Sequence, residues 1–178
     1  MENKLNIFNT RLEIYNQYEL DDKIETILTF VNNVLPDENF DEDDFLKLYG
    51  NHAMYKNIYL YYNYNELIGV SSCNFYCDEE DDTEVIVYLM VICVSEKYQN
   101  KGIGSNFLRM ILDMNNQSNI WIKIHKNNTQ SQAFFKKNDF EKVTKKSVPS
   151  VLNPSYRKPY DVYVHYKEQI PHGMIPFY

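Results

Sequence analysis

The sequence predicts a mixed α/β (α+β) fold, in which a central sheet of six to seven strands carries about four helices on its faces. Short alternating or continuous apolar segments, typical of strands, recur along the 178 residues, and amphipathic helical patterns lie between some of them. One buried strand, Val85–Val94, runs directly into a glycine turn and a helix. No internal repeat is visible, and the length fits one domain with a substantial core.

The first half of the chain is predicted to contain two helices between a first strand and a pair of strands. After an N-terminal extension at residues 1–9, we expect a strand at 11–15, helices at 21–34 and 41–48, and strands at 57–64 and 67–76. Asp21 or Asp22 can cap the first helix and Asp41 or Asp43 the second, because carboxylates accept hydrogen bonds from the amides of a first turn. The segment Asn63–Glu66 is typical of a hairpin turn.

The second half alternates strands with helices and ends in two strands. The expected elements are strand 85–94, helix 104–114, strand 119–125, helix 130–138, and an antiparallel pair at 140–148 and 161–167. The first of these helices would bury one apolar face, made by Phe107, Leu108, Ile111, Leu112 and Met114. In strand 119–125 the three isoleucines take one face, and Trp121, Lys123 and His125 take the other.

Composition and charge exclude several classes of protein. The net charge of −7 argues against a nucleic-acid partner, because binding phosphates requires a basic face. No apolar stretch reaches membrane-spanning length and no leader pattern begins the chain, so we expect no membrane partner and a cytoplasmic location. Cys73, Cys77 and Cys93 lack paired spacing and are expected to be reduced thiols. The histidines lie at no metal-ligand spacing, so no metal is expected.

The acidic clusters at residues 37–44 and 78–84 have two interpretations. They are either solvated loops or a field that draws a cationic substrate towards a nearby cleft.

The glycine turn is the most informative segment of the chain. Gly102 and Gly104 lie one residue apart in a sequence that has five glycines, between a strand and a helix. The amides of such a turn lack partners and lie at the positive end of the helix dipole, and glycine lets the backbone approach a ligand oxygen. The turn is predicted to bind a pyrophosphate, although a sharp structural joint would use the same residues. Neither the P-loop nor the dinucleotide fingerprint fits the spacing.

Two motifs resemble the GCN5-related N-acetyltransferase (GNAT) superfamily over about residues 10–167, with 168–178 as a C-terminal tail. The motif Gln99-x-x-Gly102-x-Gly104 after an apolar strand is similar to the family's acyl-CoA pyrophosphate loop. The segment Asn128-x-x-Ser131-x-x-Phe134-Phe135-x-x-x-x-Phe140 is similar to the family's segment after the fifth strand. The resemblance implies an acyl-CoA N-acyltransferase domain whose sheet splays between its fourth and fifth strands. The pantetheine arm of acetyl-CoA would lie in that opening.

The resemblance also implies the cofactor contacts residue by residue. Ile92 and Val94 would pair through their backbones with the pantetheine arm, and Asn128, Phe134 and Phe135 would border it towards the thiol. The pyrophosphate would be bound by the turn residues Gln99, Asn100, Lys101, Gly102, Ile103, Gly104 and Ser105. Phe135 stands where the family has a tyrosine, so it cannot donate a proton to the leaving thiolate. Asp139 stands where the family has a glycine, which is tolerable if that turn keeps an ordinary φ.

The stretch from Tyr88 to Gly104 is similar to that of protein N-terminal acetyltransferases. In that subgroup a tyrosine and a histidine handle the proton of the amine through water. Tyr88 matches the tyrosine, Lys123 stands at the histidine position, and His125 lies two residues further on. Since the acceptor amine must lose a proton, the candidate catalytic bases are Tyr88, His125 and Glu84.

Acceptor contacts are expected from two loops. Pro36 lies where the N-terminal acetyltransferases grip their peptide, and Tyr156 and Tyr160 belong to a Pro/Tyr-rich loop that often closes over the acceptor in this family. These features favour direct acetyl transfer from acetyl-CoA to a protein or peptide amine. The alternatives are acetylation of a small amine, such as a polyamine or amino sugar, and a CoA-binding module with little catalysis. The chain would be a monomer or a homodimer.

Overall fold

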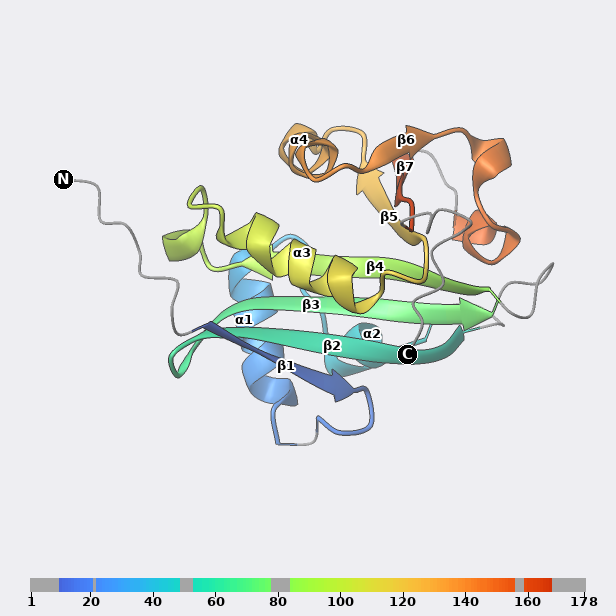
Figure 1. Cartoon of the computed structure of the whole chain (residues 1–178). Helices are drawn as coiled ribbons and strands as arrows, with labels where there is room; N and C mark the ends of the chain where they lie inside the picture. The colour runs from blue at the N-terminus through green and yellow to red at the C-terminus, as the bar shows by residue number, and fades with distance from the viewer. Residues whose placement is uncertain (1–9, 21, 49–52, 78–83, 156–158, 168–178) are drawn as a thin grey trace, which may run out of the picture.

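The computed structural model describes residues 10–20, 22–48, 53–77, 84–155 and 159–167 (Figure 1). The expected extension at residues 1–9 and the tail at 168–178 lie outside these ranges. The strands are β1 Thr10–Asn16, β2 Ala53–Asn63, β3 Glu66–Cys77, β4 Val85–Val94, β5 Ile120–His125, β6 Glu141–Val143 and β7 Tyr160–His165. The α-helices are α1 Ile24–Val34, α2 Glu42–Leu46, α3 Ile103–Met114 and α4 Thr129–Lys137.

The strands form one seven-stranded mixed sheet in the order β1-β2-β3-β4-β5-β7-β6. The first four strands are antiparallel neighbours, β4 and β5 are parallel and joined through α3, and β5, β7 and β6 are again antiparallel. The parallel ladder has two pairs within the described chain, Val87 with Ile120 and Tyr88 with Trp121. Beyond them β5 turns away from β4 (Figure 1). The predicted fold, with its splay between the fourth and fifth strands, is confirmed.

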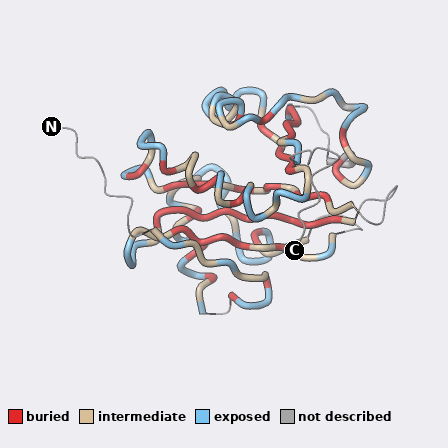
Figure 2. Tube along the Cα trace, viewed as in Figure 1, coloured by how far each residue is buried: buried red, intermediate tan, exposed pale blue. Residues whose placement is uncertain are grey.

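Helices cover both faces of the sheet. On the face called here the α3 face, α3 and α4 pack over a core that includes Phe107, Phe135 and the three isoleucines of β5. On the opposite face, called the α1 face, α1 and α2 cover one end of β2–β4. The other end of the α1 face is covered by Val148 and Leu152, which pack with Trp121 and Val164. The central strands are accordingly buried along most of their length (Figure 2).

A bulge in β4 changes which residues face which helices. Leu89 pairs with Cys73 and Val91 pairs with Ser72, so Met90 is an extra residue without a partner on β3. Before the bulge, Leu89 faces the α3 side; after it, Val91 faces α1. A bulge inserts one residue and thereby reverses the alternation of a strand. Tyr88, Val91 and Cys93 therefore all face the α1 side.

Two predicted helix details are corrected. The first helix begins at Ile24 after Lys23, which makes no side-chain cap, so Asp22 is not its cap; Asp21 lies outside the described residues. For the second helix Asp41 is the cap, since its carboxylate accepts a hydrogen bond from the amide of Asp44 at 2.7 Å. Met114 is 51% exposed rather than buried, because α3 ends there and its last turn extends past the core.

The predicted strand at 140–148 is also too long. The strand β6 stops at Val143 and is followed by 3₁₀-helices at Lys145–Ser147 and Ser150–Ser155. Pro149 has no amide to donate to a ladder, and the turns around it let Val148 and Leu152 bury against the α1 face. Cys73, Cys77 and Cys93 are reduced thiols, as expected.

Candidate functional site

The site is built around the fork between β4 and β5. From Leu89 to Val94 the edge of β4 that faces away from β3 has no strand partner within the described chain. An unpaired strand edge presents free N–H and C=O groups, and an extended ligand can add to it as another strand would. The fork opens towards the glycine turn, where β4 leads into α3 (Figure 1).

The glycine turn has the backbone geometry of an anion site. Gly102 is the N-cap of α3 at φ 78°, and Asn100 lies at φ 58°, so two residues of the turn adopt the left-handed conformation. The amide of Asn106 donates to the Gly102 carbonyl at 3.0 Å, which places Ile103, Gly104 and Ser105 in the first helical turn. Amides of a first turn have no carbonyl one turn earlier to bind, and they point out of the helix end.

The long side chains of the turn hold the turn itself. Gln99 donates from Nε2 to the Val94 carbonyl at 2.8 Å, and Lys101 donates from Nζ to the Lys97 carbonyl at 2.8 Å. Tyr98 is buried and donates its hydroxyl to Glu66 at 2.6 Å, which fastens the turn to the start of β3. With Gln99 and Lys101 engaged in this way, the groups left to bind an anion are mainly backbone amides.

Phe134 of α4 reaches across the fork to the glycine turn. A Cβ added to Gly104 would lie 3.4 Å from the Phe134 ring and 3.9 Å from Val94. The ring of Phe134 also meets that of Phe135 edge-on, with centroids 5.0 Å apart. Phe134 thus lines the fork opposite β4, whereas Phe135 is 3% exposed and packs into the core under α4.

The two ends of α4 are fixed by its own motif residues. Asn128 caps the helix, since its Oδ1 accepts from the Ser131 amide at 2.9 Å. At the other end the amide of Phe140 donates to the Phe135 carbonyl at 3.1 Å, and the amide of Asp139 donates to the Lys136 carbonyl at 3.3 Å. These two bonds form a Schellman motif.

An aspartate at position 139 was expected to be tolerated if the turn kept an ordinary φ, and the turn does not keep one. Asp139 lies at φ 64°, the left-handed conformation that the Schellman motif requires at this position. A glycine adopts that conformation without steric cost, whereas an aspartate tolerates it through its short polar side chain.

Tyr88 and Lys123 meet at the closed base of the fork, on the α1 face. The Lys123 ammonium lies 5.2 Å from the centre of the Tyr88 ring. Burial lowers the pKa of Lys123 to about 8, and burial also raises the pKa of Tyr88 above its ordinary value. Lys123 was not among the bases predicted from the sequence. The signal that could have suggested it is its position, where N-terminal acetyltransferases have the histidine that handles the proton.

A buried amide lies beside Tyr88 on the neighbouring strand. Asn74 pairs with Tyr88 across the sheet, is 0% exposed, and donates from Nδ2 to the Tyr76 hydroxyl at 3.1 Å. Its Oδ1 is buried without a hydrogen-bond partner among the described residues. Buried polar groups are nearly always paired, so Asn74 marks a polar spot within the buried part of the sheet.

His125 lies further out, at the end of β5. Its ring meets the Tyr160 ring edge-on, with centroids 5.4 Å apart. Its Nδ1 accepts a hydrogen bond from the Asn127 amide at 3.2 Å, so in the neutral ring the proton is on Nε2. The lone pair that would take a proton from an amine is therefore already engaged.

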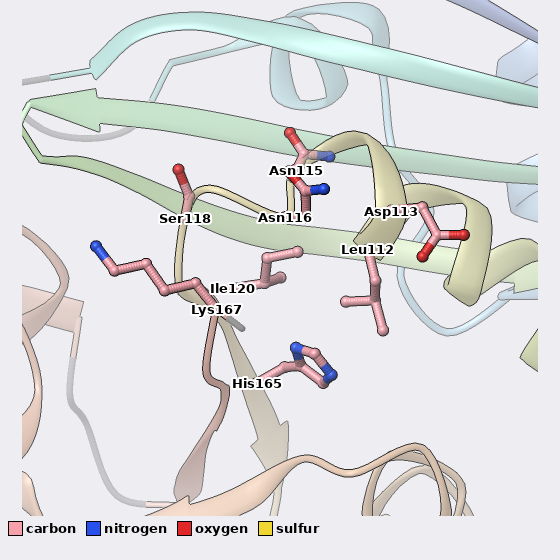
Figure 3. Close-up of a pocket in the computed structure, with 8 residues that line it drawn as sticks. All are labelled: Leu112, Asp113, Asn115, Asn116, Ser118, Ile120, His165 and Lys167. Carbon is pink, nitrogen blue, oxygen red and sulfur yellow. The ribbon is translucent and has the colours of Figure 1, made fainter. Parts of the chain in front are cut away.

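Glu84 lies at the opposite end of the strand pair from the glycine turn. It forms an ion pair with Lys167 at 3.1 Å and accepts from the side-chain Nδ2 of Asn119 at 3.5 Å. It is not brought together with Tyr88 and His125, since four residues of extended strand span about 13 Å. A cavity of about 90 Å³ lies at this closed end (Figure 3). The cavity is lined by Leu112, Asp113, Asn115, Asn116, Ser118, Ile120, His165 and Lys167.

The expected acceptor residues are placed only in part. Pro36 is exposed in the loop between α1 and α2, and Tyr160 is 40% exposed at the start of β7. Tyr156 lies outside the described residues. Among the described residues, no group of three His, Cys, Asp or Glu side chains is placed to hold a metal ion. None of the helices described is long and apolar enough to cross a membrane.

Comparison with known families identifies the family to which the chain belongs. The profile of the acetyltransferase (GNAT) family matches residues 15–140, which include β4, the glycine turn and α4. The chain belongs to the GNAT acetyltransferase family. Among curated proteins, no sequence matches the chain significantly.

Solved structures of GNAT enzymes share the fold at low sequence identity. Naa50 from Arabidopsis thaliana, in complex with the bisubstrate analogue CoA-Ac-MVNAL, is 23% identical with a TM-score of 0.55 over 86% of this chain and 95% of its own. The ribosomal-protein-S18-alanine N-acetyltransferase from Escherichia coli is 13% identical with a TM-score of 0.57 over 93% and 99%. An aminoglycoside acetyltransferase from a soil metagenome, in complex with sisomicin, is 16% identical with a TM-score of 0.56 over 72% and 86%.

Proposed function

We propose that the chain is an acetyl-CoA-dependent N-acetyltransferase whose acceptor is the amine of a protein or peptide. The observation that carries the proposal is the unpaired edge of β4 from Leu89 to Val94, which leads into a first helical turn with open amides. A pantetheine arm is an extended chain with two amides, so it can add to this edge through Ile92 and Val94. The diphosphate of the cosubstrate then accepts hydrogen bonds from the backbone of Gln99–Ser105.

The residues around the fork fit the remaining parts of the cosubstrate. Phe134 borders the fork from α4, where its ring offers an apolar surface to the pantetheine arm. Asn128 uses its Oδ1 as the helix cap, so its contribution to the arm would come from its amide nitrogen. Phe135 acts by packing behind Phe134 rather than by touching the thiol.

In this proposal the neutral amine attacks the thioester carbonyl carbon directly in a ternary complex. The C–N bond forms, the C–S bond breaks, and the thiolate takes a proton from water because Phe135 has no hydroxyl to donate. An N–H of the open β4 edge near Val91–Ile92 holds the oxyanion, as preorganised backbone donors do in acyl transfer. Orientation of the two substrates in one complex supplies much of the rate.

The acceptor approaches from the α1 face. Tyr88 faces that side, and the loop that holds Pro36 follows α1, which packs on the same side of β4. An α-amine has a pKa of about 8, so an appreciable fraction is already neutral near pH 7 and a small lowering of its pKa provides the neutral nucleophile. The structures of Naa50 with a peptide analogue and of the ribosomal-protein acetyltransferase support a peptide in this position.

The proposal is tested by incubating the protein with acetyl-CoA and a panel of peptides that differ in their first two residues. We expect thiol release and a mass increase of one acetyl group on the α-amine of some peptides. Tyr88→Phe should lower kcat by about tenfold to a hundredfold, because the neutral Tyr88 hydroxyl would relay the proton of the amine through water, with the Kd for acetyl-CoA unchanged. Tyr64→Phe, on an exposed tyrosine of the β2–β3 turn, is the matched control. Absence of product with every peptide would contradict the proposal.

A small cationic amine is the second candidate acceptor. The first turn of α2 exposes Glu42, Asp43 and Asp44 on the α1 face, and the aminoglycoside acetyltransferase is among the structural neighbours. Exposed carboxylates attract polycations over a distance that salt shortens. Faster turnover of spermidine or an aminoglycoside than of any peptide, with a rate that falls as salt rises, would favour this acceptor.

A further inference from the structure

Lys123 stands at the base of the fork, on the strand that leaves β4. Trp121 is the last β5 residue that pairs with β4. Lys123 lies two residues beyond it, about 7 Å further along the strand. If this register were continued by two residues, Lys123 would be level with the bulged residue Met90, one residue after the open edge of β4 begins at Leu89. A cosubstrate arm that pairs with this edge ends its acetyl group at the base of the fork, next to Lys123.

We propose that Lys123 is a catalytic residue that takes the proton from the attacking amine. This inference rests on the proposed function, and it identifies the general base of the proposed acetyl transfer. The neutral Nζ of Lys123 accepts a proton from the amine nitrogen as the C–N bond forms, directly or through one water. The resulting ammonium group returns that proton to solvent after the C–S bond has broken, so protons balance over one turnover.

The surroundings of Lys123 allow the neutral form near neutral pH. Burial lowers the pKa of Lys123 to about 8, because a half-buried ammonium group loses part of its hydration. Among the described residues, Tyr88 of β4 faces Lys123, His125 lies two residues further along the same strand, and Tyr76 of β3 and Tyr160 of β7 lie near Tyr88. Burial, with Tyr76 and Tyr160, raises the pKa of Tyr88, so Tyr88 stays neutral and presents no negative charge to Lys123.

Two other side chains are weaker candidates for the same role. His125 accepts a backbone hydrogen bond at Nδ1, so its basic lone pair is engaged. Lys56 also has a pKa lowered to about 8, but it is buried under α2 and donates to the carbonyls of Phe45 and Lys47. Lys56 therefore fastens α2 to the sheet, whereas Lys123 lies at the fork.

The test compares the pH dependence of kcat for wild type, Lys123→Met, Lys123→Arg and Lys123→His with one peptide. Because the peptide amine is the same throughout, differences between the profiles report on position 123. We expect Lys123→Met and Lys123→Arg to lower kcat by about a hundredfold or more, the usual contribution of a catalytic base. Lys123→His should restore part of the rate and move the acidic limb of the profile, where protonation of the base lowers kcat, to lower pH, since imidazole has a pKa of about 6.5.

Three readouts separate this role from a structural one. The Kd for acetyl-CoA and the unfolding temperature of the Lys123 variants should match wild type, and Lys126→Met, on an exposed lysine past the end of β5, should keep wild-type kcat. A Lys123→Met variant that keeps its rate and its pH profile overturns the role of Lys123 and leaves the enzyme intact. A wild-type protein that acetylates no amine overturns the proposed function and this role together.

Discussion

The two ends of the β4–β5 pair use the same strands in opposite ways. At the closed end, Val87 and Tyr88 pair with Ile120 and Trp121, and the Glu84–Lys167 ion pair spans the ends of the strands. At the open end, β4 continues without a partner and meets the glycine turn. At the closed end the backbone N–H and C=O groups of β4 bind β5 within the sheet, whereas at the open end they are available to bind a ligand. Chemistry is thus expected at one end and stability at the other.

The boundary between the two ends lies at the bulge. Met90 has no partner on β3, and it lies two residues after Tyr88, the last β4 residue of the parallel ladder. The reversal of faces at this point brings Tyr88 and the apolar residues under α1 to the same side. The inserted residue therefore lies close to where the sheet opens, and it puts Tyr88 and Val91 on the same face of the sheet.

The largest effect is expected from Gly104→Val, which fills the open end. The new side chain would meet the Phe134 ring, since even a Cβ lies 3.4 Å from it, and would cover the first-turn amides. We expect the Kd for acetyl-CoA to rise by about a hundredfold, or about 2.7 kcal/mol, measured by calorimetry. Gly104→Ala is the matched control: its Cβ makes an ordinary contact, and alanine favours the helix by up to about 1 kcal/mol over glycine. Equal binding by Gly104→Val and wild type would mean that the anion binds elsewhere.

A smaller effect is expected from Gly102→Ala, which alters the turn without filling it. No atom lies within 4 Å of a Cβ at this position, so the change acts through φ 78° alone. A left-handed alanine costs about 1–2 kcal/mol, which should appear as lower stability in urea unfolding. Asn100→Gly is the control, because Asn100 already holds φ 58° and glycine adopts it freely. Stability unchanged in Gly102→Ala would show that the turn does not hold this conformation in solution.

A change of opposite sign is expected from Asp139→Gly, at the end of the helix that flanks the open end. Glycine fits φ 64° without the steric cost that aspartate carries, so the free energy of unfolding should rise by about 0.5–1 kcal/mol. Arg109→Gly, on an exposed residue in the middle of α3, is the control and should destabilise the protein, since glycine disfavours a helix interior. A loss of stability in Asp139→Gly would indicate that the carboxylate makes a stabilising contact that outweighs the strain.

The sequence predicts the open end better than the boundary. The strand Val85–Val94, the turn and α3 follow from local patterns, and the splay follows from the resemblance. The bulge at Met90 could not be predicted, because a continuous apolar run has no alternation whose reversal would mark an inserted residue. The buried Asn74 and the low pKa of Lys123 both depend on packing between strands that are distant in sequence. The ion pair of Glu84 with Lys167 at the closed end likewise joins residues that are distant in sequence.

The smallest effect is expected from Glu84→Gln at the closed end. The ion pair with Lys167 is partly exposed, with 32% and 44% of the two side chains accessible, so its loss should cost about 0.5 kcal/mol in urea unfolding. Glutamine can still accept from Lys167 and Asn119, and kcat should stay within about twofold, because proton transfer requires a group within hydrogen-bond reach. Lys167→Met should match it in stability if the ion pair is the only contribution. A large fall in kcat for Glu84→Gln would mean that the closed end takes part in catalysis. It would contradict the assignment of catalysis to the open end and of stability to the closed end.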